Sequence, residues 1–208
     1  MLSKSENGIT HVILAAGAST RMGEPKQLLP WNSSTLIEHA IAQSLAVNNN
    51  KTFVVLGAHY DLIYQKISHL PIAIIHNLDW ESGMGSSISK AITVILQENT
   101  SCDGVLISLA DQPLIDAKHL TSLTQIFEQQ KHKIVASGFE GLYGVPAIFS
   151  NNIFKELQEL NKDFGARKII KKYKDALAVV DASAISVDID TKIQYNEMIA
   201  RHFPKGNN

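Results

Sequence analysis

Short apolar segments alternate with amphipathic ones along this chain, and that alternation limits its fold more than any other feature. Apolar runs of this length are typical of strands buried on both faces of a sheet. The predicted strands are Ile9–Ala15, Thr52–Gly57, Ile72–His76, Gly104–Leu109, Lys133–Ser137, Val145–Phe149 and Ile185–Ile189. The predicted helices are Leu36–Leu45, Tyr60–Ile67, Ser86–Gln97, Ala117–Gln129, Asn151–Leu160, Arg167–Tyr173 and Ile193–His202. This alternation predicts an α/β fold with a doubly wound, mostly parallel sheet.

The composition excludes several classes of protein. The 208 residues are predicted to form a single domain, with frayed tails at 1–8 and 204–208. Lys and Arg number 19 against 20 Asp and Glu, so no global charge draws the chain to nucleic acid or to anionic lipid. The single cysteine, Cys102, excludes a disulfide framework and fits a reducing compartment, so a cytoplasmic location is expected. No apolar run reaches the ~20 residues of a membrane-spanning helix.

Three loops lie where this fold presents its ligands, beyond the carboxyl ends of the strands where the strand order reverses. The first runs from Leu14 to Lys26. Its small residues let a ligand approach the backbone, and successive amides can form an anion-binding concavity. Arg21 and Lys26 add two cations, which suit a triphosphate better than a carboxylate. The loop is neither a Walker A motif nor a dinucleotide fingerprint.

The second loop, Glu81–Ser87, opens a predicted helix. Its free amides and the positive end of the helix dipole point outward, with two hydroxyl groups in the first turn. The loop can hold a nucleotide base or ribose, or it can be a simple glycine turn with serine caps, and the sequence leaves both open. Trp80, just before this loop, is expected to pack in the core rather than to stack on a base.

The third loop contains Asp111, which follows the buried strand Gly104–Leu109. An aspartate in this place commonly presents a carboxylate to Mg²⁺, which takes one or two protein carboxylates and completes its shell with water and phosphate oxygens. A helix cap or a turn is the alternative. Asp188 and Asp190 lie two residues apart at the end of a predicted strand and would share one face, so either can join Asp111 across the site.

These motifs together resemble those of the molybdopterin cytidylyltransferases, members of a nucleotidyltransferase superfamily with a nucleotide-diphospho-sugar transferase fold. The residues that carry the resemblance are L-A-A-G-x-S-x-R-M-G-x-x-K at 14–26, Gly83–Ser87, Asp111-Gln112-Pro113, Asp163–Arg167 and Asp188–Thr191. They span nearly the whole chain in order, and several co-linear motifs are more specific than any one of them.

The resemblance implies a Mg²⁺-dependent enzyme that transfers CMP from CTP to the phosphate of molybdenum-loaded molybdopterin and releases pyrophosphate. Arg21, Lys26 and Asp111 would be catalytic, and Asp111 and Asp190 would hold the metal. The nucleotide would be bound by Leu14, Ala15, Ala16, Gly17, Ser19, Arg21, Lys26, Gly83, Ser86 and Ser87. The acceptor side would be formed by Tyr143, Gly144, Pro146, Gly165 and Arg167. A recipient molybdoenzyme is an expected partner.

This reaction requires no general base from the protein. A phosphate acceptor is already a nucleophile at neutral pH, so the chain has only to align two anions and to neutralise the charge on the leaving pyrophosphate. Transfer from GTP or ATP, or to a sugar phosphate, is the alternative within the same enzyme class. A non-catalytic chaperone for the molybdenum cofactor is the alternative from another class.

The sequence departs from the family's pattern in two places. Tyr143 and Val145 flank Gly144 where the family often has a basic and a polar residue, which puts the acceptor's identity in doubt. Lys192–Gln194 replaces Pro-Glu-Asp after Thr191, which is expected to weaken a helix cap more than a metal ligand. The eight histidines are scattered, with no H-E-x-x-H motif, so no zinc site is expected.

Overall fold

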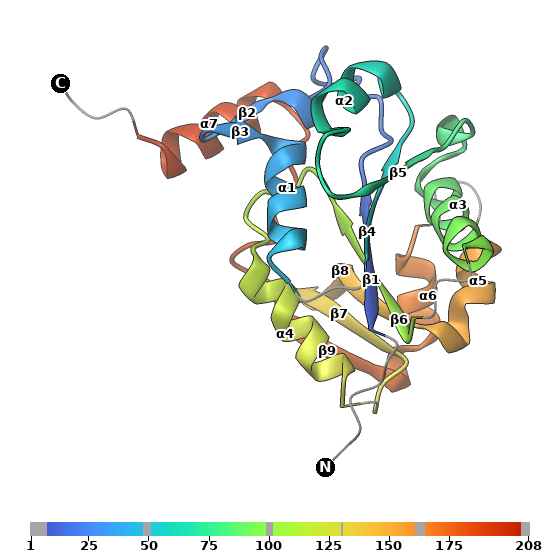
Figure 1. Ribbon diagram of the computed structural model, residues 1–208. Coiled ribbons are helices and arrows are strands. Elements are labelled where there is room, and N and C mark those ends of the chain that lie inside the picture. The colour runs from blue at the N-terminus through green and yellow to red at the C-terminus, as the bar shows by residue number, and fades with distance from the viewer. Residues whose placement is uncertain (1–7, 48–50, 99–101, 130, 161–164, 205–208) are drawn as a thin grey trace.

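The computed structural model describes residues 8–47, 51–98, 102–129, 131–160 and 165–204. A seven-stranded sheet in the order β5-β4-β1-β6-β8-β7-β9 runs through its centre (Figure 1). The strands are β1 (Ile9–Leu14), β4 (Lys51–Leu56), β5 (Ala73–His76), β6 (Gly104–Leu109), β7 (Ile134–Phe139), β8 (Leu142–Ser150) and β9 (Leu177–Asp181). The helices are α1 (Leu36–Leu45), α2 (Tyr60–Ile67), α3 (Met84–Gln97), α4 (Ala117–Phe127), α5 (Phe154–Gln158), α6 (Arg167–Lys172) and α7 (Lys192–His202).

The strand order is that of a doubly wound α/β fold, as the sequence predicts. From β1 the chain moves to β4 and then to β5 at one edge, and it next crosses to β6 on the other side of β1. The order therefore reverses between β1 and β6, and the loops that follow these two strands lie side by side. β8 is antiparallel to both of its neighbours, whereas β9 pairs with β7 in parallel.

Helices cover both faces of the sheet, and this explains why its central strands are buried and mostly apolar. Val12 of β1 packs in a core with α3, α5 and α6, and the next residue, Ile13, packs on the opposite face with α1 and α2. α4 covers the same face as α1 farther along the sheet. Figure 1 shows α3, α5 and α6 on one side and α1 and α4 on the other. Alternate residues of each central strand thus face two different cores.

Most predicted elements are confirmed, with small shifts of their ends. α1 begins at the predicted cap, because Thr35 N donates to Glu38 Oε2 at 2.9 Å and Glu38 N donates to Thr35 Oγ1 at 3.4 Å. α3 begins at Met84, two residues before the predicted start. The predicted helix 151–160 is a 3-10 turn, Asn151–Ile153, followed by the short α5.

One predicted strand is wrong. Residues 185–189 form no strand, because the backbone turns there: Ile185 N donates to the carbonyl of Ala182, and Ile189 N donates to the carbonyl of Asp111. The last strand of the sheet is instead β9, at Leu177–Asp181, which the sequence reading leaves out. The alternating apolar residues of the 185–189 segment include Ile189, which is fully buried, but in a cluster outside the sheet.

The expected weak cap of the last helix is also wrong. Thr191 N donates to Gln194 Oε1 at 3.0 Å, and Gln194 N donates to Thr191 Oγ1 at 3.3 Å, so a capping box begins α7. A glutamine in the third helical position fills this role as well as an acidic residue does. The departure from the family's Pro-Glu-Asp sequence therefore leaves the helix start intact.

A small apolar cluster joins the segment after β1 to the last helix. Helix α7 packs with a two-stranded sheet, β2 (Pro30–Trp31) and β3 (Ser34–Thr35), at the upper left of Figure 1. The buried residues of this cluster are Met22, Leu29, Trp31, Leu36, Ile189 and Met198. Met22 lies within the first loop, and Ile189 lies between Asp188 and Asp190. The cluster therefore fixes the first loop against the segment that contains Asp188 and Asp190.

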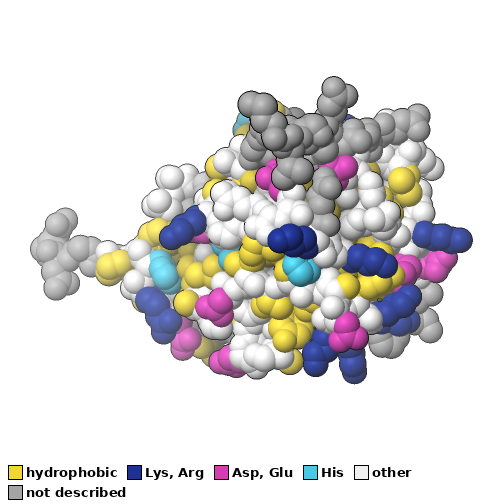
Figure 2. Space-filling model, turned by 90° about the horizontal axis from the view of Figure 1, so that it is seen from below, with side chains coloured by type: hydrophobic (Ala, Val, Ile, Leu, Met, Phe, Trp, Pro, Cys, Tyr) yellow, Lys and Arg dark blue, Asp and Glu magenta, His cyan; other side chains and the backbone are white. Residues whose placement is uncertain are grey.

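The described surface carries charges of both signs. Figure 2 shows the molecule from below, where Lys and Arg side chains are interspersed with Asp and Glu rather than gathered by sign. None of the described helices is long and apolar enough to cross a membrane.

Candidate active site

A cavity of about 530 Å³ lies where the three predicted loops meet. It opens beyond the carboxyl ends of β1 and β6, at the point where the strand order reverses. Its lining consists of Leu14, Ala15, Ala16, Gly17, Ala18, Lys26, Gln27, Trp80, Glu81, Gly83, Met84, Ser87, Leu109, Ala110, Asp111, Asp188 and Asp190. A volume of this size is within the usual range for small-molecule sites.

The first loop keeps a set of its backbone amides available. Gln27 is buried and donates through Nε2 to the carbonyl oxygens of Ala15, at 3.0 Å, and Gly17, at 2.8 Å. The hydrogen bonds among the described residues use none of the amides of residues 16–18. Because the carbonyls of this turn are held and its amides are not, the loop can form the anion-binding concavity predicted from the sequence. Gln27 is a residue that sequence reasoning missed.

Two predicted residues of the first loop lie outside the cavity lining. Ser19 has a left-handed backbone, with φ of 55°, and its Oγ accepts a hydrogen bond from Lys26 N at 3.1 Å. Its hydroxyl therefore closes the loop instead of facing the cavity. Arg21 is 70% exposed and reaches the site from outside, through a contact with Asp190.

The wall opposite the first loop depends on a glycine at the end of β4. A Cβ atom built on Gly57 would lie 2.4 Å from Trp80 Cβ and 2.8 Å from the carbonyl oxygen of Ala16. Only glycine permits this close approach. Trp80 packs against the main core, as expected, and it also lines the cavity, as do its neighbours Glu81 and Met84. From the sequence, Trp80 is expected only in the core, whereas Glu81 and Met84 belong to the second loop without an individual role.

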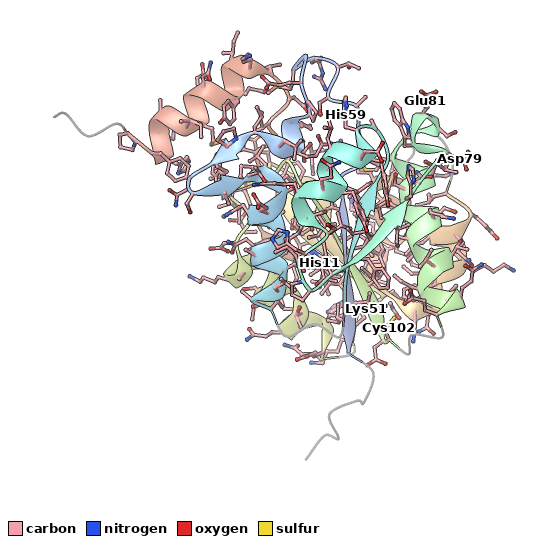
Figure 3. All side chains as sticks on the ribbon, turned by 45° about the horizontal axis from the view of Figure 1, so that its top comes forward. His11, Lys51, His59, Asp79, Glu81 and Cys102 are labelled. Atoms are coloured by element: carbon pink, nitrogen blue, oxygen red, sulfur yellow. The ribbon has the colours of Figure 1, made fainter. Side chains whose placement is uncertain are left out.

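The two serines of the second loop have different roles. Ser86 Oγ lies 2.9 Å from the carbonyl oxygens of Asp79 and Gly83 and accepts a hydrogen bond from Asn77 Nδ2, so it fastens the turn. Ser87 lines the cavity together with Gly83, whose φ is 97°. Ser86 thus has the structural role, whereas a role of Gly83 and Ser87 in nucleotide binding stays a prediction. Figure 3 shows Asp79, Glu81 and His59 at one end of the molecule, away from Lys51 and Cys102.

Lys26 lies at the centre of a charged group on one side of the cavity. Its Nζ contacts Oδ2 of Asp111 directly and lies 3.0 Å from Oδ1 of Asp190 and 3.1 Å from the carbonyl oxygen of Ile189. Arg21 Nη2 lies 3.0 Å from Oδ2 of Asp190. The side chains of Lys26 and Asp111 are only 15% and 19% exposed. The structure thus brings four predicted residues, from an early, a middle and a late part of the chain, into one group.

Asp188 and Asp190 form hydrogen bonds with different partners. Asp190 joins Asp111 through Lys26, whereas Asp188 Oδ1 accepts a hydrogen bond from Gln112 Nε2 at 2.8 Å. The predicted arrangement on one strand face does not occur, because this segment is not a strand. Both carboxylates nevertheless line the cavity.

Burial and neighbouring charges shift the pKa values of the charged group. Burial raises the pKa of Asp111 above its usual value, and the carboxylates of Asp188 and Asp190 act in the same direction against Lys26. Burial lowers the pKa of Lys26, but the adjacent Asp111 and Asp190 outweigh it and raise the pKa. Burial also raises the pKa of Asp190, yet Lys26 and Arg21 hold it below its usual value. The two carboxylates therefore require a cation in contact with them.

The oxygen atoms around Lys26 are also suitable ligands for a divalent metal. Asp111 Oδ2, Asp190 Oδ1 and the carbonyl oxygen of Ile189 converge on one ammonium group. Asp111 Oδ1 is buried and has no hydrogen-bond partner among the described residues. Mg²⁺ is bound by oxygen atoms, of which one or two carboxylates come from the protein and the others from water and phosphate. The donor set fits this ion.

Neither His11 nor Cys102 belongs to this group. His11 is fully buried between Ser44 Oγ, at 2.6 Å, and Ser108 Oγ, at 2.8 Å, and burial lowers its pKa to about 3. Cys102 is buried and carries a free thiol. Within the described ranges, no group of three His, Cys, Asp or Glu side chains is placed to hold a metal ion.

A second cavity, of about 750 Å³, contains most of the predicted acceptor side. Gly144, Gly165 and Arg167 line it, whereas Tyr143 and Pro146 do not. Tyr143 packs against the main core. Pro146 is buried, and its carbonyl oxygen accepts a hydrogen bond from Ser137 Oγ at 2.7 Å. Asp163, from the same sequence motif as Gly165, lies outside the described residues.

A comparison with known protein families identifies the family of the chain. The MobA-like NTP transferase domain matches residues 11–177. The chain belongs to this family. The matched stretch includes the first two loops, Asp111 and α6, but it ends before Asp190. The family resemblance read from the sequence is thereby confirmed.

Several named relatives extend over nearly the whole chain. The purine catabolism protein PucB of Bacillus subtilis is 31% identical over 91% of this chain and 95% of its own length. Nicotine blue oxidoreductase of Paenarthrobacter nicotinovorans is 28% identical over 92% and 96%. The molybdenum cofactor cytidylyltransferase of Escherichia coli is 22% identical over 89% and 92%.

Solved structures share the fold. Rv0371c of Mycobacterium tuberculosis has a TM-score of 0.81 at 22% identity, with 93% of this chain and 98% of that chain covered. A structure of Rv0371c in complex with manganese has a TM-score of 0.77 at 21% identity, with 92% and 98% covered. The chain therefore has a nucleotide-diphospho-sugar transferase-like architecture, in agreement with the fold predicted from its motifs.

Proposed function

We propose that this protein is a Mg²⁺-dependent cytidylyltransferase that transfers CMP from CTP to the phosphate of molybdenum-loaded molybdopterin and releases pyrophosphate. The observation that carries the proposal is the group of Lys26, Asp111 and Asp190 beside a loop with unbonded amides. Membership of the family supports nucleotidyl transfer. The name of the Escherichia coli relative supports both the cytidine nucleotide and the acceptor.

Different residues at the first cavity would bind different parts of the nucleotide and the metal. The amides of residues 16–18 and the cations of Arg21 and Lys26 would hold the triphosphate, since all of them present positive charge to one region. Gly83 and Ser87 would contact the base or the ribose from the opposite wall. Asp111 and Asp190 would hold Mg²⁺, which supplies positive charge to the phosphate oxygens when bound.

The transfer itself needs no general base from the protein. An oxygen of the acceptor phosphate forms a bond to the α-phosphorus of CTP, and the bond from that phosphorus to the β-phosphate oxygen breaks. Pyrophosphate leaves with the electron pair of the broken bond. The contribution of the chain is to align the two anions and to stabilise the charge on the leaving group, which is the role proposed for Lys26 and Arg21. We place this reaction in the cytoplasm, where the free thiol of Cys102 would stay reduced.

Pyrophosphate release by the purified protein tests this function. The protein is supplied with Mg²⁺, molybdenum-loaded molybdopterin and CTP, GTP or ATP in turn. We expect turnover with CTP and at least about 100-fold less with the other two, because a site that hydrogen-bonds its ligand discriminates strongly against analogues that leave polar groups unpaired. Turnover with GTP or ATP alone would replace the assigned nucleotide. Binding of CTP without turnover on this acceptor would overturn the assigned acceptor.

A further inference from the structure

The first loop is held in place through its carbonyl oxygens. Gln27 binds two of four successive carbonyl oxygens, as described above. The other two are bound from the segment between β4 and α2. Ala58 N donates to the carbonyl oxygen of Ala16 at 3.0 Å. His59 Nε2 donates to the carbonyl oxygen of Ala18 at 3.2 Å, because a carbonyl oxygen can only accept. A side chain outside the three predicted loops thus contacts the first of them.

The hydrogen bond from His59 also sets the direction of a backbone amide. In a trans peptide group, the carbonyl of one residue and the N–H of the next point in opposite directions. His59 therefore turns the N–H of Ser19 away from the segment between β4 and α2. Among the described residues Ser19 N donates no hydrogen bond, so it continues the row of unbonded amides at 16–18. The positive φ of Ser19, 55°, bends the chain there, as in the backbone concavities that bind anions.

Rotation of the peptide group between Ala18 and Ser19 would harm an anion site. Ala18 lines the first cavity. If the group rotated, its carbonyl oxygen would replace the amide N–H that faces a bound phosphate. The carbonyl oxygen carries partial negative charge and would repel the phosphate, whereas the N–H attracts it. The hydrogen bond from His59 opposes this rotation, because the carbonyl would lose its partner.

The conformation of His59 is not explained by a role in α2 or in the core. His59 immediately precedes α2, at a position where a side chain commonly bonds to the first amides of a helix, but it makes no such bond. Its φ of 58° is unfavourable for a residue with a Cβ atom. Its side chain is exposed, so the ring is not held there by burial. Figure 3 shows His59 at the end of the molecule that also carries Glu81, a residue of the first cavity.

We propose that His59 is a positioning residue of the phosphate site, and that its hydrogen bond to Ala18 holds the first loop with the amide of Ser19 directed toward the triphosphate. This inference rests on the proposed function, since it takes the first loop as the site of the triphosphate. It is independent of the base and of the acceptor. The phosphate site then extends past the cavity lining to the part of the loop that carries Arg21.

The binding of inorganic triphosphate tests this role, because that ligand has the phosphates but neither a base nor an acceptor. Isothermal titration calorimetry in the presence of Mg²⁺ gives the affinity. His59→Gly removes the donor and tolerates the positive φ. We therefore expect Kd to rise about three- to tenfold, the effect of losing one hydrogen bond, while Tm stays within about 3 °C of the wild type. His59→Gln removes the ring but keeps an N–H donor at a similar reach, and it should restore Kd to within about twofold of the wild type.

Asn32→Gly is the matched control for the backbone effect of the glycine. Asn32 is also exposed and also has a positive φ, 53°, but it lies between β2 and β3, outside the first loop. The substitution relieves the same kind of backbone conformation without removing the donor to Ala18. Its Kd for inorganic triphosphate should stay within about twofold of the wild type.

The outcomes separate this inference from the proposed function. Wild-type affinity in His59→Gly would overturn the inference, even if the protein transfers CMP. Equal weakening in His59→Gly and His59→Gln would also overturn it, because the N–H donor would then not be the group that matters. Absence of triphosphate binding by the wild type would overturn it as well. Triphosphate binding that depends on His59, in a protein that releases no pyrophosphate from any nucleotide, would support the inference and contradict the proposed reaction.

Discussion

The ammonium group of Lys26 lies 3.0 Å from Oδ1 of Asp190, a residue 164 positions later in the chain. The same ammonium group contacts Asp111, so one cation neutralises two carboxylates from different loops. These carboxylate oxygens are the ones that would hold Mg²⁺. Lys26 and the metal therefore compete for the same atoms, and Lys26 has to leave them when the metal enters.

Replacement of Lys26 should strengthen the binding of a free divalent cation. In Lys26→Met the two carboxylates lose their ammonium partner, and their mutual repulsion favours any other cation between them. We expect the affinity for Mn²⁺ without nucleotide to rise about tenfold or more, as measured by the loss of its free EPR signal, an effect that corresponds to about 1.4 kcal/mol. Turnover should fall, because the triphosphate loses a cation.

A lysine from an unrelated ion pair provides the control for that experiment. Lys192 Nζ lies 3.1 Å from Glu24 Oε1 on the surface, so Lys192→Met removes an equal charge without exposing the candidate metal ligands. Its Mn²⁺ affinity should remain that of the wild type. Weaker Mn²⁺ binding in Lys26→Met than in the wild type would show that Lys26 supports the metal site instead of competing with the metal.

Two glycines near the first cavity should respond differently to the same substitution. Gly57→Ala places a methyl group 2.4 Å from Trp80 Cβ, so we expect the free energy of unfolding to fall by about 1–3 kcal/mol. Gly17→Ala meets no atom within 4 Å and should keep the stability of the wild type within about 1 kcal/mol.

The effect of Gly17→Ala should appear in ligand binding instead of in stability. Gly17 lines the first cavity, so its added methyl group would separate the triphosphate from the loop amides and weaken CTP binding. Urea denaturation and a CTP titration of both variants test the pair of expectations. Wild-type CTP affinity in Gly17→Ala would show that the ligand does not approach this part of the backbone.

The sequence predicts the position of the site better than its internal structure. The strands β1 and β6 are apolar on both faces, so their ends, and with them the loops of Lys26 and Asp111, are readable from the pattern alone. Gln27 escapes this reading, because a glutamine beside a cationic loop is typical of the surface. Its burial depends on two carbonyl groups that only the folded loop presents to it.

The segment that contains Asp188 and Asp190 shows why the internal structure of the site cannot be predicted from the local sequence. Residues 185–189 have the alternating apolar pattern of a strand, yet Ile189 is buried against α7 and the first loop instead of in the sheet. A pattern reports which residues are buried, but not which partner buries them. The different partners of Asp188 and Asp190 follow from that placement, because Gln112 donates a hydrogen bond to one carboxylate and Lys26 to the other.

The buried histidine of β1 should make the fold sensitive to acid. The pKa of His11 is about 3 in the folded protein, against 6.5 for an exposed histidine, so only the unfolded chain takes up this proton between these two pH values. The free energy of unfolding therefore falls as the pH falls from 6.5 toward 3, by up to about 1.4 kcal/mol per pH unit from this one group.

Urea denaturation at pH 7, 6 and 5 measures this slope. It should be shallower in His11→Gln, which removes the titrating group, and unchanged in His69→Gln, at an exposed position. His39 and His119 also have pKa values lowered by burial, so part of the slope should persist in both variants. A His11→Gln slope equal to that of the wild type would refute the assignment to His11.

The central claim is that Asp111 and Asp190 form the metal-binding centre of a nucleotidyl transfer, and pyrophosphate release by matched aspartate variants tests it most directly. Asp111→Asn and Asp190→Asn keep the size of the side chains but remove the charges, whereas Asp181→Asn changes an exposed residue of β9. With CTP, Mg²⁺ and molybdenum-loaded molybdopterin, we predict at least about 100-fold slower turnover for the first two variants and wild-type turnover for the third. Turnover in Asp111→Asn within about threefold of the wild type, with the fold intact, would contradict the claim.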